Sequence, residues 1–256
     1  MTMFSASGRS WDVVTLAERP DLLRPALELG GVGPEFMQHG PVALLASAGL
    51  LSHRWPEHFA IVLDAGRVVA RAVSIPLAMG VGGRDELPDH GWDAALLWAA
   101  EDALRGRRGT CVVALDIQVA EDRRGEGIST VALAALRHHA ALLGFQQVVA
   151  PVRPTGKARE PFGDLMEYAG RRRPDGLPAD PWIRVHVRAG GRIVKPAPFS
   201  MTIQGTLRQW RRWTGQPFEQ DGLVAVPGGL APVMVSQALD LGVYVEPNLW
   251  IRHDTG

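Results

Sequence analysis

Hydrophobic and polar positions follow two different periods along this chain. In HFAIVLDAGRVVARAVSIPL, residues 58–77, two runs rich in β-branched residues flank Asp64, Ala65 and Gly66, which predicts a β-hairpin. In GWDAALLWAAEDALRG, residues 91–106, apolar residues recur at helical spacing, and Gly106 is placed to end the helix. The same patterns predict strands at 11–16, 111–119 and 146–152 and a helix at 127–143.

The remaining segments have weaker patterns. Residues 18–29 favour a helix interrupted by proline, and residues 41–51 are apolar enough for a buried helix or a buried strand. Residues 153–181, rich in proline and glycine, predict an ordered but irregular excursion. After it we expect a helix at 182–188, a strand at 191–195, a helix at 206–213 and a strand at 243–252. Because strands and helices are mixed, the class is α/β or α+β with a mixed sheet.

The composition argues against several classes of protein. Lys+Arg and Asp+Glu balance at 27 each, so no strong field points to nucleic acid or an anionic membrane as a partner. The single cysteine, Cys111, excludes an internal disulfide and fits a reducing cytoplasm. The N-terminus has no apolar signal-peptide core, and no run approaches the roughly 20 apolar residues of a membrane span. We therefore expect a cytoplasmic protein that at 256 residues can form one large domain.

The turn between the strand at 111–119 and the helix at 127–143 carries the clearest candidate chemistry. A strand that ends in glycines and feeds a helix leaves the first N–H groups of that helix unpaired around a small concavity. The helix dipole adds about half a positive charge there, and Arg123 and Arg124 are placed to add more. Glycine at 125 and 127 removes Cβ atoms that would hold a phosphate away. RRGEGIS therefore predicts a phosphate site, with a purely structural turn as the alternative.

This turn resembles the coenzyme A loop of the GNAT superfamily, the acyl-CoA N-acyltransferases. In that family a central strand runs into the pattern [QR]xxGx[GA], and the next helix receives the pyrophosphate of coenzyme A. Arg124, Gly127 and Ser129 match, with serine where the family usually has glycine or alanine. RPTGKA at 153–158 also fits the pattern, but no long amphipathic helix follows it. The resemblance implies a cofactor site made by Val119, Arg123, Arg124, Gly125, Glu126, Gly127, Ile128, Ser129 and Thr130.

A second segment resembles the same family independently. Many GNAT domains carry a helix that ends in a segment like YEKLGF before the penultimate strand. HVRAGGRIV, residues 186–194, has that shape, with His186 in the tyrosine position and Gly190 in the glycine position. The resemblance implies a GNAT-like mixed, mostly antiparallel central sheet flanked by helices, in a single domain over 1–256. Its core covers about 11–200, with an irregular insertion at 153–181 and a C-terminal extension at 200–256 that supplies the last strand.

The resemblance also implies direct transfer of an acyl group from acetyl-CoA, or another acyl-CoA, to an amine that must first lose a proton. Asp116 and Gln118 share one face of the strand LDIQV. Asp116 is a candidate base and Gln118 a candidate to hold a relaying water, unless Asp116 merely pairs with an arginine. The N–H of Val119 or Ala120 is implied as the donor to the oxyanion. His186 is implied as the acid that protonates the thiolate, with a packing role as the alternative.

These inferences predict an acyl-CoA-dependent N-acyltransferase, in the first instance an N-acetyltransferase, that acts on a small metabolite through a tetrahedral intermediate. The alternative is a catalytically inactive GNAT-like module that binds acyl-CoA or a partner protein. No metal is expected, because no Cys, Asp or Glu stands at metal-ligand spacing from His138 and His139. The expected partners are a small-molecule amine and neither nucleic acid nor membrane, and a homodimer is left open.

Overall fold

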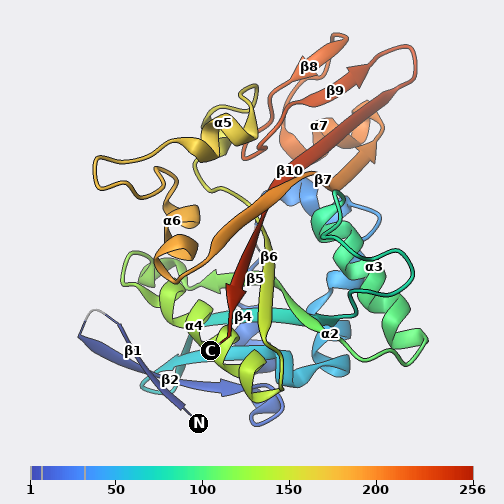
Figure 1. Ribbon diagram of the computed structural model, residues 1–256. Coiled ribbons are helices and arrows are strands. Elements are labelled where there is room, and N and C mark those ends of the chain that lie inside the picture. The colour runs from blue at the N-terminus through green and yellow to red at the C-terminus, as the bar shows by residue number, and fades with distance from the viewer. Residues whose placement is uncertain (1, 7, 32, 256) are drawn as a thin grey trace.

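The computed structural model describes residues 2–6, 8–31 and 33–255 of the chain, and Figure 1 shows its elements. The strands are β1 (Thr2–Ala6), β2 (Arg9–Thr15), β3 (Phe59–Asp64), β4 (Arg67–Leu77), β5 (Cys111–Val119), β6 (Gln147–Val152), β7 (Arg192–Gly205), β8 (Gly222–Val224), β9 (Val233–Ser236) and β10 (Leu241–Asp254). The α-helices are α1 (Leu23–Leu27), α2 (Ala48–Arg54), α3 (Gly91–Leu104), α4 (Ile128–Leu142), α5 (Leu165–Gly170), α6 (Pro181–Arg188) and α7 (Leu207–Thr214). Short 3-10 turns are η1 (Pro20–Leu22), η2 (Glu35–His39), η3 (Ala43–Ala46), η4 (Pro56–His58), η5 (Glu121–Arg123) and η6 (Lys157–Arg159).

The described strands form one mixed sheet. Their order is β1-β2-β3-β4-β5-β6-β10-β9-β8, with β7 also paired to β10. Neighbouring strands are antiparallel except β5 and β6, which are parallel. These two pair only at Val112 with Val148 and Val113 with Val149, and then diverge. The C-terminal half of β5 therefore has no strand neighbour on its β6 side, and the sheet opens there.

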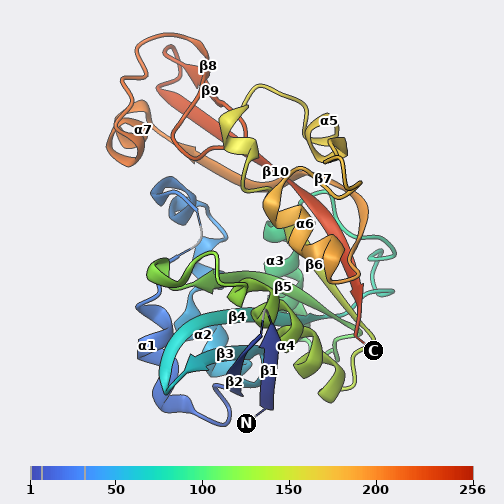
Figure 2. The same ribbon diagram turned by 90° about the vertical axis from the view of Figure 1, so that its left-hand side faces the viewer.

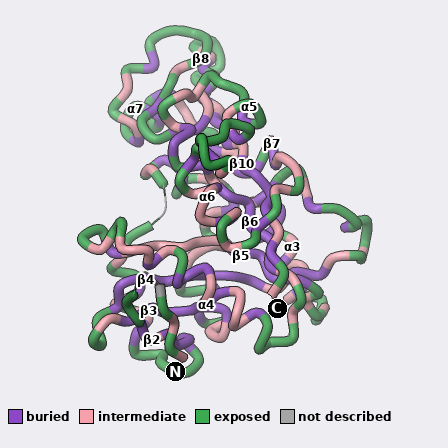
Figure 3. Tube along the Cα trace, turned by 60° about the vertical axis from the view of Figure 1, so that its left-hand side comes forward, coloured by how far each residue is buried: buried purple, intermediate pink, exposed green. Residues whose placement is uncertain are grey.

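Both faces of the central sheet are covered by helices. On one face, Ile128 and Val131 of α4 pack against Val62 of β3. On the other face, Leu96 of α3 packs in a cluster that contains Ile61. Adjacent residues of β3 thus serve opposite cores, as the alternation of side chains along a strand requires. Strands β3 and β4 are accordingly buried over most of their length (Figure 3).

Strands β7 and β10 are long enough to leave the central sheet and build a second lobe with β8, β9 and α7 (Figure 2). Its core contains Trp210 and Trp213 of α7, Tyr244 of β10 and Phe36 of η2. The contact of Phe36 fastens η2, which comes from the N-terminal part of the chain, to this C-terminal lobe. Among the described residues, no helix has the length and apolarity needed to cross a membrane.

Most predicted elements are confirmed with small differences at their ends, including the hairpin, the helices α3 and α4 and the strands β5 and β6. Three predictions differ from the structure. Residues 41–51 form part of two short helical segments, η3 and α2, rather than one buried element. The strand expected at 191–195 extends as β7 to Gly205, and β1, β8 and β9 were not predicted. These strands have weak patterns of their own, and pairing with β2, β9 and β10 stabilises them.

Candidate active site

The glycine turn after β5 has the geometry of an anion site. Gly125 and Gly127 have φ of 90° and 82°, a left-handed conformation that favours glycine. Helix α4 begins at Ile128 without a side-chain N-cap, and its first intrahelical bond is donated by Thr130 to the carbonyl of Gly127 at 3.0 Å. The N–H groups of residues 125–129 have no acceptor among the described residues, so they can bind an anion at the positive end of the helix dipole.

Ion pairs fix the shape of this turn. Arg123 donates to Glu126 at 2.8 Å and to Asp64 of β3 at 2.7 Å, and Arg9 donates to Glu126 at 2.7 Å. These carboxylates, Glu126 first, raise the pKa of Arg123. Arg123 is thus engaged inside the turn, whereas Arg124 has a 60% exposed side chain and only Glu121 nearby, at 3.9 Å. Of the two predicted arginines, Arg124 is the one available to a phosphate.

The backbone of β5 presents donors to the opening of the sheet. The N–H of Ala120 donates to the carbonyl of Val69 on β4 at 2.9 Å, so it is not available to an oxyanion. Because N–H groups alternate in direction along an antiparallel strand, those of Ile117 and Val119 point away from β4, toward the side from which β6 has diverged. Of the two predicted oxyanion donors, the geometry leaves Val119.

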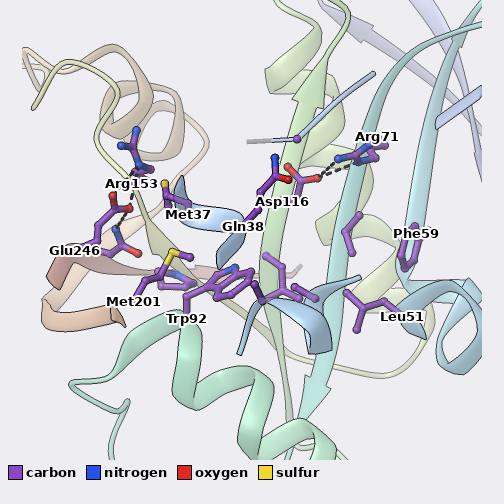
Figure 4. A pocket seen from close by; sticks show the side chains of 17 residues that line it. Met37, Gln38, Leu51, Phe59, Arg71, Trp92, Asp116, Arg153, Met201 and Glu246 are labelled. Atoms are coloured by element: carbon purple, nitrogen blue, oxygen red, sulfur yellow. Dashed lines mark hydrogen bonds and ion pairs between the residues drawn. The ribbon is translucent and has the colours of Figure 1, made fainter. Parts of the chain in front are cut away.

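A cavity of about 340 Å³ lies beside this part of β5 (Figure 4). Segments far apart in the sequence surround it, and most of its lining is apolar. The lining residues are Gly31, Met37, Gln38, Ala43, Ala46, Leu51, Phe59, Arg71, Val73, Trp92, Leu115, Asp116, Pro151, Arg153, Met201, Glu246 and Asn248. The volume suits a small molecule with an apolar stem and polar ends.

Asp116 is the predicted site residue that lines this cavity. Its Oδ2 accepts from Nε and Nη2 of Arg71 at 2.9 and 2.7 Å (Figure 4). The predicted pairing with an arginine is therefore present. Arg71, 6% exposed, also donates to the carbonyls of Ala26 and Gly30, both at 2.7 Å.

The second carboxylate oxygen of Asp116 distinguishes it from a purely structural acid. Oδ1 is buried and has no hydrogen-bond partner among the described residues. Burial raises the pKa of Asp116, and the nearby guanidinium of Arg71 opposes that rise. A buried carboxylate oxygen without a donor needs a proton or an ammonium group, and the cavity is where one can reach it.

The other two predicted catalytic residues lie elsewhere. Gln118 shares the face of Asp116 but donates to the carbonyl of Leu29 at 3.2 Å and does not line the cavity. His186 lies on α6, 2% exposed, with Nδ1 at 2.9 Å from Nε2 of His253 on β10. Burial lowers the pKa of His186 to about 3. The structure therefore does not bring His186 together with Asp116.

Sequence reasoning missed the opposite wall of the cavity. Glu246 of β10 is fully buried and accepts from Nε of Arg153 at 3.0 Å and from the hydroxyl of Tyr244 at 2.6 Å. Asn248 donates to Glu246 at 3.3 Å and accepts from Ser200 at 2.6 Å. One signal was available: glutamate in the otherwise apolar strand GVYVEPNLWI is unusual, because a buried charge requires partners.

Comparisons with known proteins bear on the family and the fold of this chain. No family model matches the chain. The arginine N-acetyltransferase avaD of Aspergillus versicolor is 32% identical in an alignment that covers 95% of this chain and 93% of that protein.

Two solved structures share the fold. The loading GNATL domain of CurA from Lyngbya majuscula has a TM-score of 0.59 at 15% identity and covers 96% of this chain and 98% of its own. The GphF GNAT-like decarboxylase in complex with isobutyryl-CoA has a TM-score of 0.53 at 16% identity, over 96% of this chain and all of its own, 100%. The predicted sheet and family are thus confirmed. The chain belongs to the GNAT superfamily and is an acyl-CoA-dependent N-acyltransferase that transfers an acyl group to an amine.

Proposed function

We propose that this enzyme transfers the acetyl group of acetyl-CoA to an amine of arginine or of a closely similar amino acid. The observation that carries the proposal is the buried Oδ1 of Asp116, which has no described hydrogen-bond partner and faces a cavity of small-molecule size. The acceptor class is supported by the similarity to an arginine N-acetyltransferase over most of the chain.

The glycine turn holds the co-substrate in this proposal. The free N–H groups of residues 125–129 bind the pyrophosphate of coenzyme A, and Arg124 adds a mobile positive charge. Arg123 and Glu126 do not contact the ligand through their charges but keep the turn in shape. The thioester then extends along the opening between β5 and β6, so that its carbonyl lies beside the N–H of Val119.

The residues of β5 carry out the transfer. Asp116 accepts a proton from the ammonium group at Oδ1, and the neutral amine attacks the thioester carbon. Val119 donates its N–H to the oxyanion of the tetrahedral intermediate. The C=O bond then re-forms as the C–S bond breaks with its electron pair on sulfur. The second proton of the attacking nitrogen passes through water at the open cleft to the thiolate, which leaves the amide and the free thiol of coenzyme A. The buried, neutral imidazole of His186 has no support as the proton donor here.

Arg71 has a positioning role in the same scheme. It holds Oδ2 of Asp116, so that Oδ1 is directed toward the acceptor, and it fastens residues 26–30 over the edge of the cavity. Gln118, bound to the carbonyl of Leu29, supports the same segment. The relay through a water held by Gln118 remains the alternative route for the proton.

The direct test is thiol release from acetyl-CoA with arginine as acceptor, with the product identified by mass. Lysine, ornithine, agmatine and glycine form the comparison panel. We expect turnover with arginine and a lower kcat/KM for agmatine, which lacks the carboxylate, and for glycine, which lacks the side chain. Acetylation of none of these amines, in a protein that binds acetyl-CoA, would overturn the proposed acceptor class.

A further inference from the structure

A second cavity lies at the other end of β5 and β6 from the active site. Its volume is about 320 Å³, and it lies between the start of these strands, β7, β10 and the loop that precedes α3. Cys111 and Arg252 belong to its strand side, whereas Asp85 and Glu86 belong to its loop side. None of these residues has a role in acyl transfer to the amine.

Arg252 has a buried hydrogen-bond donor in this cavity that lacks an acceptor among the described residues. Its Nε is buried without a hydrogen-bond partner, and among the described residues its guanidinium forms no ion pair. The neighbouring cation, Lys195, is by contrast neutralised by Asp89 at 2.7 Å and also donates to the carbonyl of Leu87 at 3.2 Å. A buried N–H of a guanidinium needs an acceptor, and the planar set of guanidinium donors fits a carboxylate in a bidentate manner.

The loop side of the cavity has the opposite charge. Asp85 and Glu86 are exposed and form no ion pair within the described residues. The loop is held in place by Arg84, which donates to Asp102 of α3 at 2.8 Å and to the carbonyl of Ala78 at 3.3 Å. The two carboxylates therefore belong to a fixed loop that lines the same cavity as Arg252.

We propose that this cavity binds a free α-amino acid, with its carboxylate on Arg252 and its ammonium group on Asp85 and Glu86. One cation and two carboxylates, none of them in an ion pair among the described residues, line a volume that admits a small zwitterion. A simple anion would leave the acidic edge unused, and a simple amine would leave Arg252 unsatisfied. The site is separate from the acceptor cavity, and the inference does not depend on the proposed acceptor.

Cys111 provides a local measurement. It is the single cysteine, it lines the cavity and is 7% exposed, and burial raises the pKa of its thiol to about 11 while Arg252 opposes that rise. Alkylation by N-ethylmaleimide at alkaline pH, followed by intact mass, therefore reports on access to this cavity. A ligand present at about ten times its Kd is expected to slow the labelling about tenfold.

The experiment compares arginine, alanine, propionate, propylamine and inorganic phosphate as protecting probes. We expect at least one of the two amino acids to protect more strongly than propionate, and propylamine and phosphate not to protect. Arg252→Gln should abolish protection, whereas Arg208→Gln, an exposed arginine of α7 without an ion pair, should leave it unchanged. The double variant Asp85→Asn with Glu86→Gln, which alters only exposed side chains, should reduce protection by the amino acid to the level of propionate.

The variant Asp116→Asn distinguishes binding at the cavity of Asp116 from binding at the cavity of Arg252. It changes only the first cavity, so the amino acid should still protect Cys111 from labelling. Calorimetry on the parent and on Arg252→Gln gives a second readout if labelling proves too slow. Equal protection by propionate or phosphate, or no binding difference between the parent and Arg252→Gln with either amino acid, would overturn the proposal.

Discussion

The two halves of the active site are constructed in different ways. The glycine turn that precedes α4 is one continuous segment, residues 120–130, whose donors are backbone N–H groups. The proposed acceptor cavity takes its lining from η2, η3, α2, β3, β4, α3, β5, β6, β7 and β10 and from loop residues beside them. A continuous backbone site is encoded locally, so it can be found by motif. A site of converging side chains exists only after the sheet and the second lobe have formed.

The ion pairs of the two halves also differ, because those of the cavity are more deeply buried than those of the turn. Ion pairs in the turn, such as that of Arg9 with Glu126, are partly exposed and are screened by salt. The pairs of the cavity, Arg71 with Asp116 and Arg153 with Glu246, are largely buried. Loss of one member of a buried pair leaves the other charge uncompensated, so variants in the cavity should have larger effects than variants in the turn.

The largest effect is expected for Asp116→Asn. The change keeps the size of the side chain but removes the proton acceptor, so kcat should fall by about 10²–10⁴ while the affinity for coenzyme A is unchanged. Because burial raises the pKa of Asp116, kcat of the parent should fall as the pH drops through a value above the ordinary 3.8, and the variant should lack this dependence. If Gln118→Ala instead loses more turnover than Asp116→Asn, the proton leaves through a relay.

Arg71→Met should give the next largest change, in stability. It removes the partner of a buried carboxylate and the donors to Ala26 and Gly30, which should lower the free energy of unfolding by about 3–5 kcal/mol in denaturant titrations. Arg67→Met, on the same strand but in an exposed pair with Asp122, is the matched control with a far smaller cost. An equal loss of unfolding free energy in the two variants would mean that the buried pair of Arg71 with Asp116 contributes no more to stability than the exposed pair of Arg67 with Asp122.

Gly127→Asp tests the turn. It places a side chain at φ 82° and a negative charge at the N-terminus of α4. A charge at this position is worth up to about 2 kcal/mol, so the Kd for coenzyme A should rise by up to about 30-fold in calorimetry. Gly176→Asp, at φ 79° in a loop with open space around it, controls for backbone strain. Unchanged affinity in a folded Gly127→Asp protein would move the phosphate site elsewhere, with residues 153–158 the next candidate.

His186→Phe should affect stability rather than turnover. Burial lowers the pKa values of His186 and His253 to about 3 and about 4, so the folded state resists protonation that the unfolded chain accepts near 6.5. Stability of the parent should therefore be full above about pH 6.5 and decline as the pH falls toward 4. The variant should lose about 1–3 kcal/mol at neutral pH and show a shallower acid decline. A large loss of kcat in a folded variant would restore His186 as the acid.

Arg124→Gln should have the smallest effect. The side chain is 60% exposed and only loosely paired, so its loss should raise the Kd for coenzyme A by about threefold at low salt and less at high salt. Thermal stability should not change. A salt-independent loss would indicate a specific contact in place of a screened charge.

Local structure and the conformation of the glycine turn were accessible from the sequence because their causes are local. Strand β5 and helix α4 follow from periods of two and 3.6 in their apolar residues, and Gly125 and Gly127 mark a backbone that few other residues adopt. The family resemblance rested on this segment and on a second short one, residues 186–194. Each of these features depends on residues within one or two turns of one another, so no distant contact was needed to infer them.

The tertiary structure alone decided which side chains meet. Asp116 lines the cavity, where Arg71 of β4 binds one of its oxygens and the other has no partner among the described residues. His186, equally prominent in the sequence, is instead buried against His253. Glu246 reaches the cavity because β10 crosses from the second lobe to the central sheet. Contacts between residues far apart in the sequence, as in the pairing of β6 with β10 or the ion pair of Arg71 with Asp116, follow from the packing of the whole chain, and local periodicity carries no record of them.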